Sequence, residues 1–316
     1  MSGYSSEELV DNIKSLKKEK KAVIFGNYFQ LPEIQDICDF IGDSLELTQK
    51  ANETNADVIV FCGVNYMAET GKILAPDKKV LIPDLEAVCN LTESCPADEF
   101  ETFIKARPKY TIISYINSSA EVKALSDIIV TSRNAVSIVN SIPYDENIIF
   151  APDRNLGAYI NNLTARNMVL WNGTCSIHDV LSNERVLALK ENHPEAKLIA
   201  HPRCKPEILK IADFVGSTTA LLEYTRKTKD EEFIVATDSG IIHQMKKYNP
   251  DKSFIIIPTD ESAMCNECPH MKLNNLEKLY NCILNEEYEI KLSDEIINKA
   301  KVPLERMLDL SKKLSF

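Results

Sequence analysis

Short apolar runs alternate with longer amphipathic stretches along almost the whole chain of 316 residues. The apolar runs are rich in β-branched residues and apolar on both faces, which is typical of parallel strands covered by helices. The amphipathic stretches predict an opening helix and further helices over residues 31–53 and 180–194. The alternation predicts an α/β fold with right-handed crossovers. The predicted strands are AVIFG, DVIVFCG, KVLIP, YTIISYI, DIIVTS, NIIFAP, MVLWNG, KLIAH, DFVGS, EFIVAT and SFIIIP.

A weak internal repeat runs through this pattern with a period of roughly 85 to 90 residues. Each repeat carries a polar turn after a strand, then a turn bearing a hydroxyl, then a cysteine. These residues are Asn27, Ser44 and Cys89; then Asn117, Ser132 and Cys175; and finally His201, Thr218 and either Cys265 or Cys268. The repetition predicts three domains over residues 1–106, 107–192 and 193–316, the last including the C-terminal helices.

Parallel α/β layers present their chemistry at the carboxyl ends of the strands. Three similar layers around an axis would direct three sets of loops, and one cysteine from each, to a central point. The sequence therefore predicts three pseudo-symmetric three-layer αβα domains whose parallel sheets converge on a central site. In this arrangement Cys268 is one corner of a three-cysteine site and not half of a local pair with Cys265.

Three converging cysteines predict a metal site, and two alternatives fit it. Three thiolates without a fourth protein ligand suit a 4Fe–4S cluster with one open iron, which acts as a Lewis acid. A zinc ion held by three cysteines usually takes a histidine as its fourth ligand, and His178 or His270 is available. Spacing alone leaves both open, since thiolates suit either metal.

Composition and charge narrow the classes of molecule that the protein can bind. The formal net charge of −11 argues against binding a nucleic-acid backbone, which needs a basic face. No apolar stretch reaches the roughly 18 residues that would span a membrane, and the start lacks the order of a signal peptide. We therefore expect a cytoplasmic protein, with no nucleic-acid or membrane partner, whose nine cysteines are thiols or metal ligands.

The sequence also resembles the quinolinate synthase family over nearly its whole length. The resemblance rests on LPEIQDICDFIGDSLEL, FCGVNYMAETGKIL, KKVLIPD, YINSSAEVKALSDIIVTSRNA, APDRNLGAYI, GTCSIHD, HPRC, ADFVGSTT and CPHM. It implies three pseudo-symmetric α/β domains around an oxygen-sensitive 4Fe–4S cluster with one open iron. The implied ligands are Cys89, Cys175 and Cys268, and Cys265 stands where many members have a further, non-ligating cysteine.

The resemblance implies condensation of iminoaspartate with dihydroxyacetone phosphate, with loss of phosphate and water, to form quinolinate for NAD synthesis. An amino-acid oxidase or dehydrogenase would supply the imine. The residue types fit these small anionic substrates, because hydroxyls donate to carboxylate or phosphate oxygens and histidine exchanges protons near neutral pH. We predict that Ser44, Ser132 and Thr218 bind substrate, and that Tyr115, Asn117 and His201 orient it, with Tyr115 and His201 also moving protons.

The chain departs from the family pattern at four positions. The family usually has histidine at Asn27, tyrosine at Phe29, glutamate at Arg203 and glutamate at Asp238. We still place Asn27 and Arg203 among the catalytic and substrate-binding residues, because a guanidinium binds carboxylate or phosphate in a forked contact. The departures keep three alternatives open: a divergent paralogue using another anionic substrate pair, a non-catalytic iron–sulfur ligand sensor, and a structural zinc protein.

Overall fold

The computed structural model describes residues 4–259 and 266–315. Within them, twelve strands form three separate four-stranded sheets in which all paired strands are parallel. The first sheet contains β1 (Ala22–Asn27), β2 (Phe40–Gly42), β3 (Val58–Cys62) and β4 (Lys79–Leu81). The second contains β5 (Thr111–Tyr115), β6 (Ile128–Val130), β7 (Ile148–Ala151) and β8 (Val169–Leu170). The third contains β9 (Lys197–Ala200), β10 (Phe214–Val215), β11 (Glu232–Ala236) and β12 (Ser253–Ile256).

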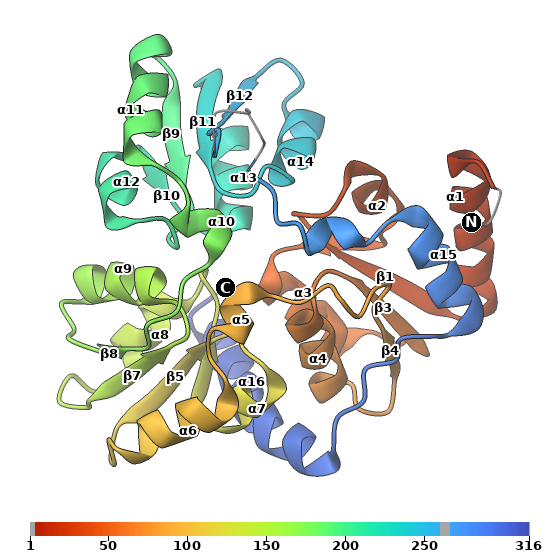
Figure 1. Cartoon of the computed structure of the whole chain (residues 1–316), viewed down its shortest axis with the longest axis horizontal. Coiled ribbons are helices and arrows are strands. Elements are labelled where there is room, and N and C mark those ends of the chain that lie inside the picture. Colours follow the sequence, from red (N-terminus) through yellow and green to blue (C-terminus); the bar gives the residue numbers. More distant parts are fainter. Residues whose placement is uncertain (1–3, 260–265, 316) are drawn as a thin grey trace.

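The three sheets share one topology. Their strand orders are β2-β1-β3-β4, β6-β5-β7-β8 and β10-β9-β11-β12, so each sheet places its second strand at one edge and its fourth at the other. The α/β class with parallel sheets, predicted from the apolar runs, is confirmed. Each sheet with its covering helices forms one of three lobes, called here the first, second and third lobes, which surround the middle of the molecule (Figure 1).

Helices connect the strands and cover the sheets. Those up to the end of the first sheet are α1 (Ser6–Glu19), α2 (Pro32–Ile37), α3 (Ser44–Glu53) and α4 (Asn65–Leu74). The next are α5 (Asn90–Glu93), α6 (Ala97–Lys105), α7 (Ala120–Ala124), α8 (Ala135–Ser141), α9 (Arg154–Thr164) and α10 (Ser176–Asp179). The remainder are α11 (Asn183–Asn192), α12 (Pro206–Ile211), α13 (Thr218–Lys227), α14 (Ile241–Tyr248), the 3-10 turn η1 (Met271–Leu273), α15 (Leu276–Asn285) and α16 (Asp294–Lys313).

The single helix predicted over residues 31–53 is wrong, because β2 divides it into α2 and α3. Asp39 explains the break: its carboxylate accepts a hydrogen bond of 2.7 Å from the backbone N–H of Ile24 and pairs with Lys17 at 2.6 Å. These contacts hold the chain extended, so that β2 pairs with β1. Asp43 then caps α3, accepting from two backbone N–H groups of its first turn.

The C-terminal segment leaves the third lobe and packs against the other two. Helix α15 contacts α1 of the first lobe, and α16 contacts α7 and β6 of the second. Between these helices, the backbone N–H of Ile290 donates a hydrogen bond of 2.8 Å to the carbonyl of Val80 in β4. The last helices therefore fasten the first and second lobes together. The domain boundaries after residues 106 and 192 stay predictions.

The strands are buried because helices cover both faces of each sheet. All five residues of β3 are buried, and Ile24, Phe150 and Phe233 have no exposed surface in the first, second and third sheets. Each such side chain contributes about 1.5–3 kcal/mol relative to its exposed state. This packing makes the strand ends rigid supports for the turns that follow them.

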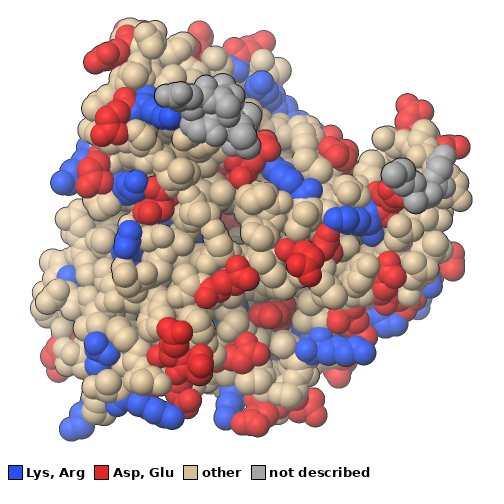
Figure 2. Space-filling view, in the orientation of Figure 1, with Lys and Arg blue, Asp and Glu red and all other residues tan. Residues whose placement is uncertain are grey.

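The surface carries charges of both signs. In Figure 2, lysine and arginine side chains are interspersed with aspartate and glutamate, and no continuous basic area covers the face that is visible. Among the described residues, none of the helices combines the length and the apolar character that a membrane span requires.

Candidate active site

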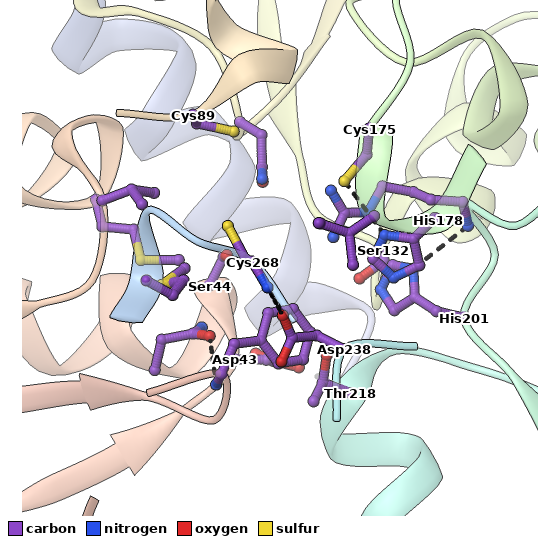
Figure 3. Close-up of a pocket in the computed structure, with 18 of the residues that line it drawn as sticks. Asp43, Ser44, Cys89, Ser132, Cys175, His178, His201, Thr218, Asp238 and Cys268 are labelled. Atoms are coloured by element: carbon purple, nitrogen blue, oxygen red, sulfur yellow. Dashed lines mark hydrogen bonds between the residues drawn. The ribbon is translucent and has the colours of Figure 1, made fainter. Parts of the chain in front are cut away.

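One cavity lies where the three lobes meet, and residues of every lobe line it (Figure 3). All eleven residues that we predicted for substrate, catalysis or metal line it: Asn27, Ser44, Cys89, Tyr115, Asn117, Ser132, Cys175, His201, Arg203, Thr218 and Cys268. The four positions that depart from the family pattern also lie on its wall, since Phe29 and Asp238 join Asn27 and Arg203 there. Cys265 lies outside the described residues. The cavity brings the predicted residues together, and their individual roles stay predictions.

The polar turns at the carboxyl ends of β1, β5 and β9 form part of the wall. Asn27 ends β1, and its side chain bridges two backbone groups: Oδ1 accepts from the N–H of Phe29 at 3.0 Å, and Nδ2 donates to the carbonyl of Gly42 at 3.4 Å. Tyr115 ends β5, and His201 directly follows β9. The repeated topology places these three turns at equivalent positions, which is why they face one space.

The hydroxyl turns lie at the starts of helices. Ser44 is the first residue of α3 and Thr218 is the first residue of α13, while Ser132 stands shortly before α8. The N-caps of α3 and α13 also touch across the lobes, because the Ser217 hydroxyl donates a hydrogen bond of 3.2 Å to Asp43. A helix N-terminus offers backbone N–H donors and a positive dipole end. At α3 the Asp43 carboxylate already accepts from two of these N–H groups, so Ser44 offers its hydroxyl to the cavity beside an occupied cap.

Glu46 joins all three lobes beside these turns. Its Oε2 accepts a hydrogen bond of 2.7 Å from Thr219 in the third lobe, and its Oε1 pairs with Arg133 of the second lobe at 3.2 Å. Burial and the nearby Asp43 carboxylate raise the pKa of Glu46, whereas the partners in the other lobes oppose that shift. Its contacts fix the mutual placement of the helix ends that line the cavity.

A close backbone contact positions the Phe29 turn against the third lobe. A Cβ added to Gly240 would lie 2.7 Å from the Cα of Phe29, so only glycine allows this approach. The Gln35 side chain spans the same junction and donates a hydrogen bond of 2.9 Å to the carbonyl of Gly240. Phe29 is held with only 8% of its surface exposed.

The three predicted metal-binding cysteines come from three parts of the chain to one space. Cys89 and Cys175 directly precede the short helices α5 and α10, and the backbone N–H of Cys268 donates to Asp238 at 2.6 Å. In Figure 3 their sulfur atoms border the same open region. Burial raises the pKa of Cys175 to about 11 and that of Cys268 to about 12, and the three sulfurs repel one another's charge. A bound metal would be needed to hold all three as thiolates.

The donor chemistry of the cavity fits an iron–sulfur group, because soft thiols are the usual ligands of such clusters and three of them line it. Within the described ranges 4–259 and 266–315, no group of three or more histidine, cysteine or acidic side chains is close enough to hold one metal ion. The histidines proposed for zinc have other partners: His178 contacts Thr237 at 2.9 Å, and His270 contacts the carbonyl of Glu86 at 3.2 Å.

Two neutral histidines lie beside Cys175. His178 contacts the sulfur of Cys175 at 3.3 Å through Nδ1, and its ring centroid lies 4.9 Å from that of His201. Burial lowers the pKa of both histidines, and the positive charge of Arg203 lowers them further. Nδ1 of His201 accepts from the backbone N–H of Arg203 at 3.3 Å, so its ring proton resides on Nε2. His201 is therefore a neutral donor.

Tyr115 and Arg203 form the adjoining wall. The Arg203 guanidinium carbon lies 5.5 Å from the centroid of the Tyr115 ring, within the range of a cation–π contact. Burial raises the pKa of Tyr115 to about 12, although Arg203 and a hydrogen bond with Ser132 oppose the shift. The phenol therefore keeps its proton near neutral pH and offers a hydroxyl donor to the cavity.

Several functional candidates escaped the sequence analysis. Tyr66 and Asp43 line the cavity, and Tyr66 contacts the Ser44 hydroxyl at 3.3 Å. Tyr66 follows β3 closely, so a search of every strand end could have found it. No feature of the sequence marked Lys123 as a candidate. It is fully buried, burial lowers its pKa to about 8, and its Nζ lies 5.5 Å from the centroid of the Tyr66 ring.

We expect Asp153 to make the free energy of unfolding measurably dependent on pH. It caps α9 through Oδ1, while its buried Oδ2 has no hydrogen-bond partner, and burial raises its pKa to about 6. A raised acid pKa means that the folded state holds the proton more tightly. Its contribution to the free energy of unfolding is therefore complete below about pH 4 and lost as the pH rises through about 6. Urea denaturation of the full chain under reducing conditions checks this.

Two substitutions test whether Asp153 causes this pH dependence of stability, one at Asp153 itself and one as a control. Asp153→Asn keeps the capping oxygen and should flatten the decline between about pH 4 and 6. Asp213→Asn is the matched control, because hydrogen bonds from Leu198 and Lys190 lower the Asp213 pKa despite its burial. Its contribution is lost as the pH falls, so this substitution should leave the decline in place. Parallel profiles for wild type and Asp153→Asn would contradict the prediction.

The fold and cavity define a class: a three-lobed α/β protein with a thiol-lined pocket where equivalent strand ends meet. A family model for quinolinate synthetase A protein matches residues 11–309. The chain is 54% identical over 305 residues to "Quinolinate synthase" of Trichodesmium erythraeum (strain IMS101), covering 96% of this chain and 94% of the relative. It is 55% identical over 304 residues to "Quinolinate synthase" of Synechocystis sp. (strain ATCC 27184 / PCC 6803 / Kazusa), covering 96% of each.

The chain therefore belongs to the quinolinate synthase family, whose members are 4Fe–4S enzymes. The resemblance noted from the sequence motifs is confirmed, and it extends over almost the entire chain.

Proposed function

We propose that this protein is a quinolinate synthase, which condenses iminoaspartate with dihydroxyacetone phosphate and releases phosphate and water. One observation carries the proposal: a chain matched to quinolinate synthases over 96% of its length lines a single cavity with one cysteine from each repeat. An amino-acid oxidase or dehydrogenase would supply the imine, since an imine is the product of such an oxidation.

Cys89, Cys175 and Cys268 would hold the 4Fe–4S cluster in this proposal. With three protein ligands, one iron is left open and supplies Lewis-acid chemistry toward a hydroxyl or carbonyl oxygen. His178 supports the ligand set, because its ring contacts the Cys175 sulfur and is anchored by Thr237 on its other side. The buried surroundings of Cys175, only 7% exposed, limit access of water to that side of the site.

The hydroxyl turns bind the anionic groups of the substrates. Ser44 and Thr218 stand at the first positions of ten-residue helices, where hydroxyl and backbone N–H donors converge. Ser132 and Asn117 extend this donor set from the second lobe. Oδ1 of Asn117 is buried and has no hydrogen-bond partner among the described residues, so it is available to accept a hydrogen bond from a bound substrate.

Tyr115 and His201 handle protons at the reacting centre. Both are neutral donors near pH 7, the phenol because its pKa is raised and the imidazole because its pKa is lowered. A neutral imidazole can donate from Nε2 while its Nδ1 stays fixed by the Arg203 backbone. Asn27 can orient a substrate but cannot exchange protons, because an amide does not titrate in this range.

A second candidate function is favoured by one observation on the same cavity wall. Arg203 is 5% exposed, and its guanidinium has no ion-pair partner among the described residues, whereas the family usually has a glutamate there. Together with Asn27 and Phe29, this favours a divergent paralogue that applies the same chemistry to a different anionic substrate pair. The two candidates differ in substrate and share the cluster.

Anaerobic turnover separates the candidates. The cluster is reconstituted in the full chain, iminoaspartate and dihydroxyacetone phosphate are supplied, and quinolinate is measured by its ultraviolet absorbance after chromatography. We expect quinolinate to form with turnover that depends on the cluster. Absence of product, with activity gained by the triple variant Asn27→His, Phe29→Tyr and Arg203→Glu, would reject quinolinate synthesis by the natural chain in favour of the paralogue.

A further inference from the structure

Arg203 is a buried cation that faces the cavity without a protein partner. Its Nε is buried and unbonded, and its guanidinium makes no hydrogen bond or ion pair with residues 4–259 and 266–315. The backbone around it is fixed, since its N–H donates to His201 and its carbonyl accepts from Asn155 at 3.3 Å. The turn therefore holds the guanidinium in place, and no described residue forms an ion pair or a hydrogen bond with it.

Two groups near Arg203 can carry negative charge, but among the described residues neither forms an ion pair or a hydrogen bond with its guanidinium. Asp153 and Cys175 interact with Arg203 electrostatically. Oδ1 of Asp153 is used by the N–H groups of Asn155 and Leu156 at the start of α9, and its Oδ2 has no hydrogen-bond partner within the described residues. Tyr115 lies beneath the guanidinium and presents its ring face to it. Buried N–H groups without acceptors are unfavourable, so the guanidinium is suited to binding an anionic ligand.

The cavity has two sets of anion donors with different shapes. Ser44 and Thr218, at the starts of α3 and α13, supply hydroxyl donors that can bind a compact phosphate, while the caps Asp43 and Ser217 already accept from N–H groups of those helices. Arg203 supplies a planar fork, which fits the two oxygens of a carboxylate. We infer that Arg203 binds a carboxylate group of the substrate and thereby selects a dicarboxylate over a phosphate at its side of the cavity. This inference rests on the proposed function, because it names the substrate class for the same site.

Equilibrium binding to the anaerobically reconstituted full chain tests the assignment. The probes are quinolinate, as a dicarboxylate, and inorganic phosphate. Wild type is compared with Arg203→Gln, which removes the charge, and Arg203→Lys, which keeps the charge without the fork. Arg154→Gln is the matched control, because Arg154 bonds Asn172 outside the cavity and the substitution removes the same formal charge.

We expect quinolinate affinity to fall about 10- to 100-fold in Arg203→Gln, the usual range for losing a charge-assisted contact. Arg203→Lys should lose less, and Arg154→Gln should bind like wild type. Phosphate affinity should change by less than about threefold, because its donors lie elsewhere. The ligand-free Tm of Arg203→Gln is measured alongside, and a lower Tm with unchanged quinolinate affinity would assign Arg203 a structural role through Asp153 instead.

Unchanged quinolinate affinity in Arg203→Gln would overturn the assignment, and so would an equal loss of phosphate affinity. Loss of iron and of visible absorbance in this variant would also overturn it, because Arg203 would then be needed to keep the cluster bound. Failure of wild type to bind quinolinate would overturn it as well. Turnover is scored separately. A wild type that binds quinolinate through Arg203 and makes none would reject the proposed function and leave this inference standing.

Discussion

Replacing Cys175 by serine is expected to remove the iron–sulfur cluster and to lower quinolinate formation by more than about 1,000-fold, because a Lewis acid supplies several kcal/mol of transition-state stabilisation. Cys175 belongs to a set of three sulfurs that borders one space, and a hydroxyl is a poor substitute for a soft thiolate ligand. Iron analysis should drop from about four iron atoms per chain, and the visible absorbance should disappear. Cys89→Ser and Cys268→Ser should behave in the same way.

Cys282→Ser is the matched control for these substitutions. Cys282 is a fully buried cysteine of α15, and its sulfur contacts the carbonyls of Ile82 and Glu287, away from the cavity. This variant should keep its iron and its activity even if its stability falls. A Cys175→Ser protein that retains full iron content, with normal turnover, would show that the three cysteines do not form the ligand set.

Replacing Tyr115 by phenylalanine is expected to lower kcat by about 100- to 10,000-fold while the cluster remains bound, the range associated with losing a proton-transfer group. The substitution removes only the hydroxyl that hydrogen-bonds with Ser132 and leaves the ring under Arg203. KM should change less than kcat, because the anion donors Ser44 and Thr218 are untouched. Steady-state kinetics and iron analysis on the same preparation check the result.

Tyr224→Phe tests whether loss of any phenol hydroxyl from a packed tyrosine would have the same effect. Tyr224 stacks on Phe214 in the third lobe, with ring centroids 4.4 Å apart, and does not line the cavity. Removal of the Tyr224 hydroxyl should leave kcat within about threefold of wild type. If Tyr115→Phe behaved like this control, the phenol would have no part in proton transfer, and His201 would remain as the proton donor in the proposal.

The departures from the family pattern have a common physical theme. Asn27 and Phe29 offer no group that titrates near neutral pH, and Arg203 brings a fixed charge where an exchangeable carboxylate is usual. All three lie on one cavity. In the proposal, proton transfer is therefore assigned to Tyr115 and His201, and anion binding to Arg203. The turnover experiment decides whether proton transfer by these two residues still leads to quinolinate.

Much of the fold could be predicted from the sequence because the patterns that mark strands and helices are local. Apolar, β-branched runs mark buried parallel strands, and eleven runs were recognised in this way. β2 was missed because it spans only Phe40–Gly42 and lies inside a stretch with helical periodicity. Its existence depends on Asp39 reaching the backbone of Ile24, a contact between residues 15 positions apart. Local periodicity carries no information about such a contact.

The sequence by itself determined that the protein is α/β, repeats three times, and carries a turn, a hydroxyl and a cysteine in each repeat. It could do so because strand ends and their chemistry lie within a few residues of one another along the chain. Only the tertiary structure decided that no described residue forms an ion pair with Arg203, that burial lowers the pKa of His178 and His201, and that Glu46 joins three lobes. These properties arise from burial and from contacts between distant segments, which set the charge of a group and have no counterpart in the order of residues.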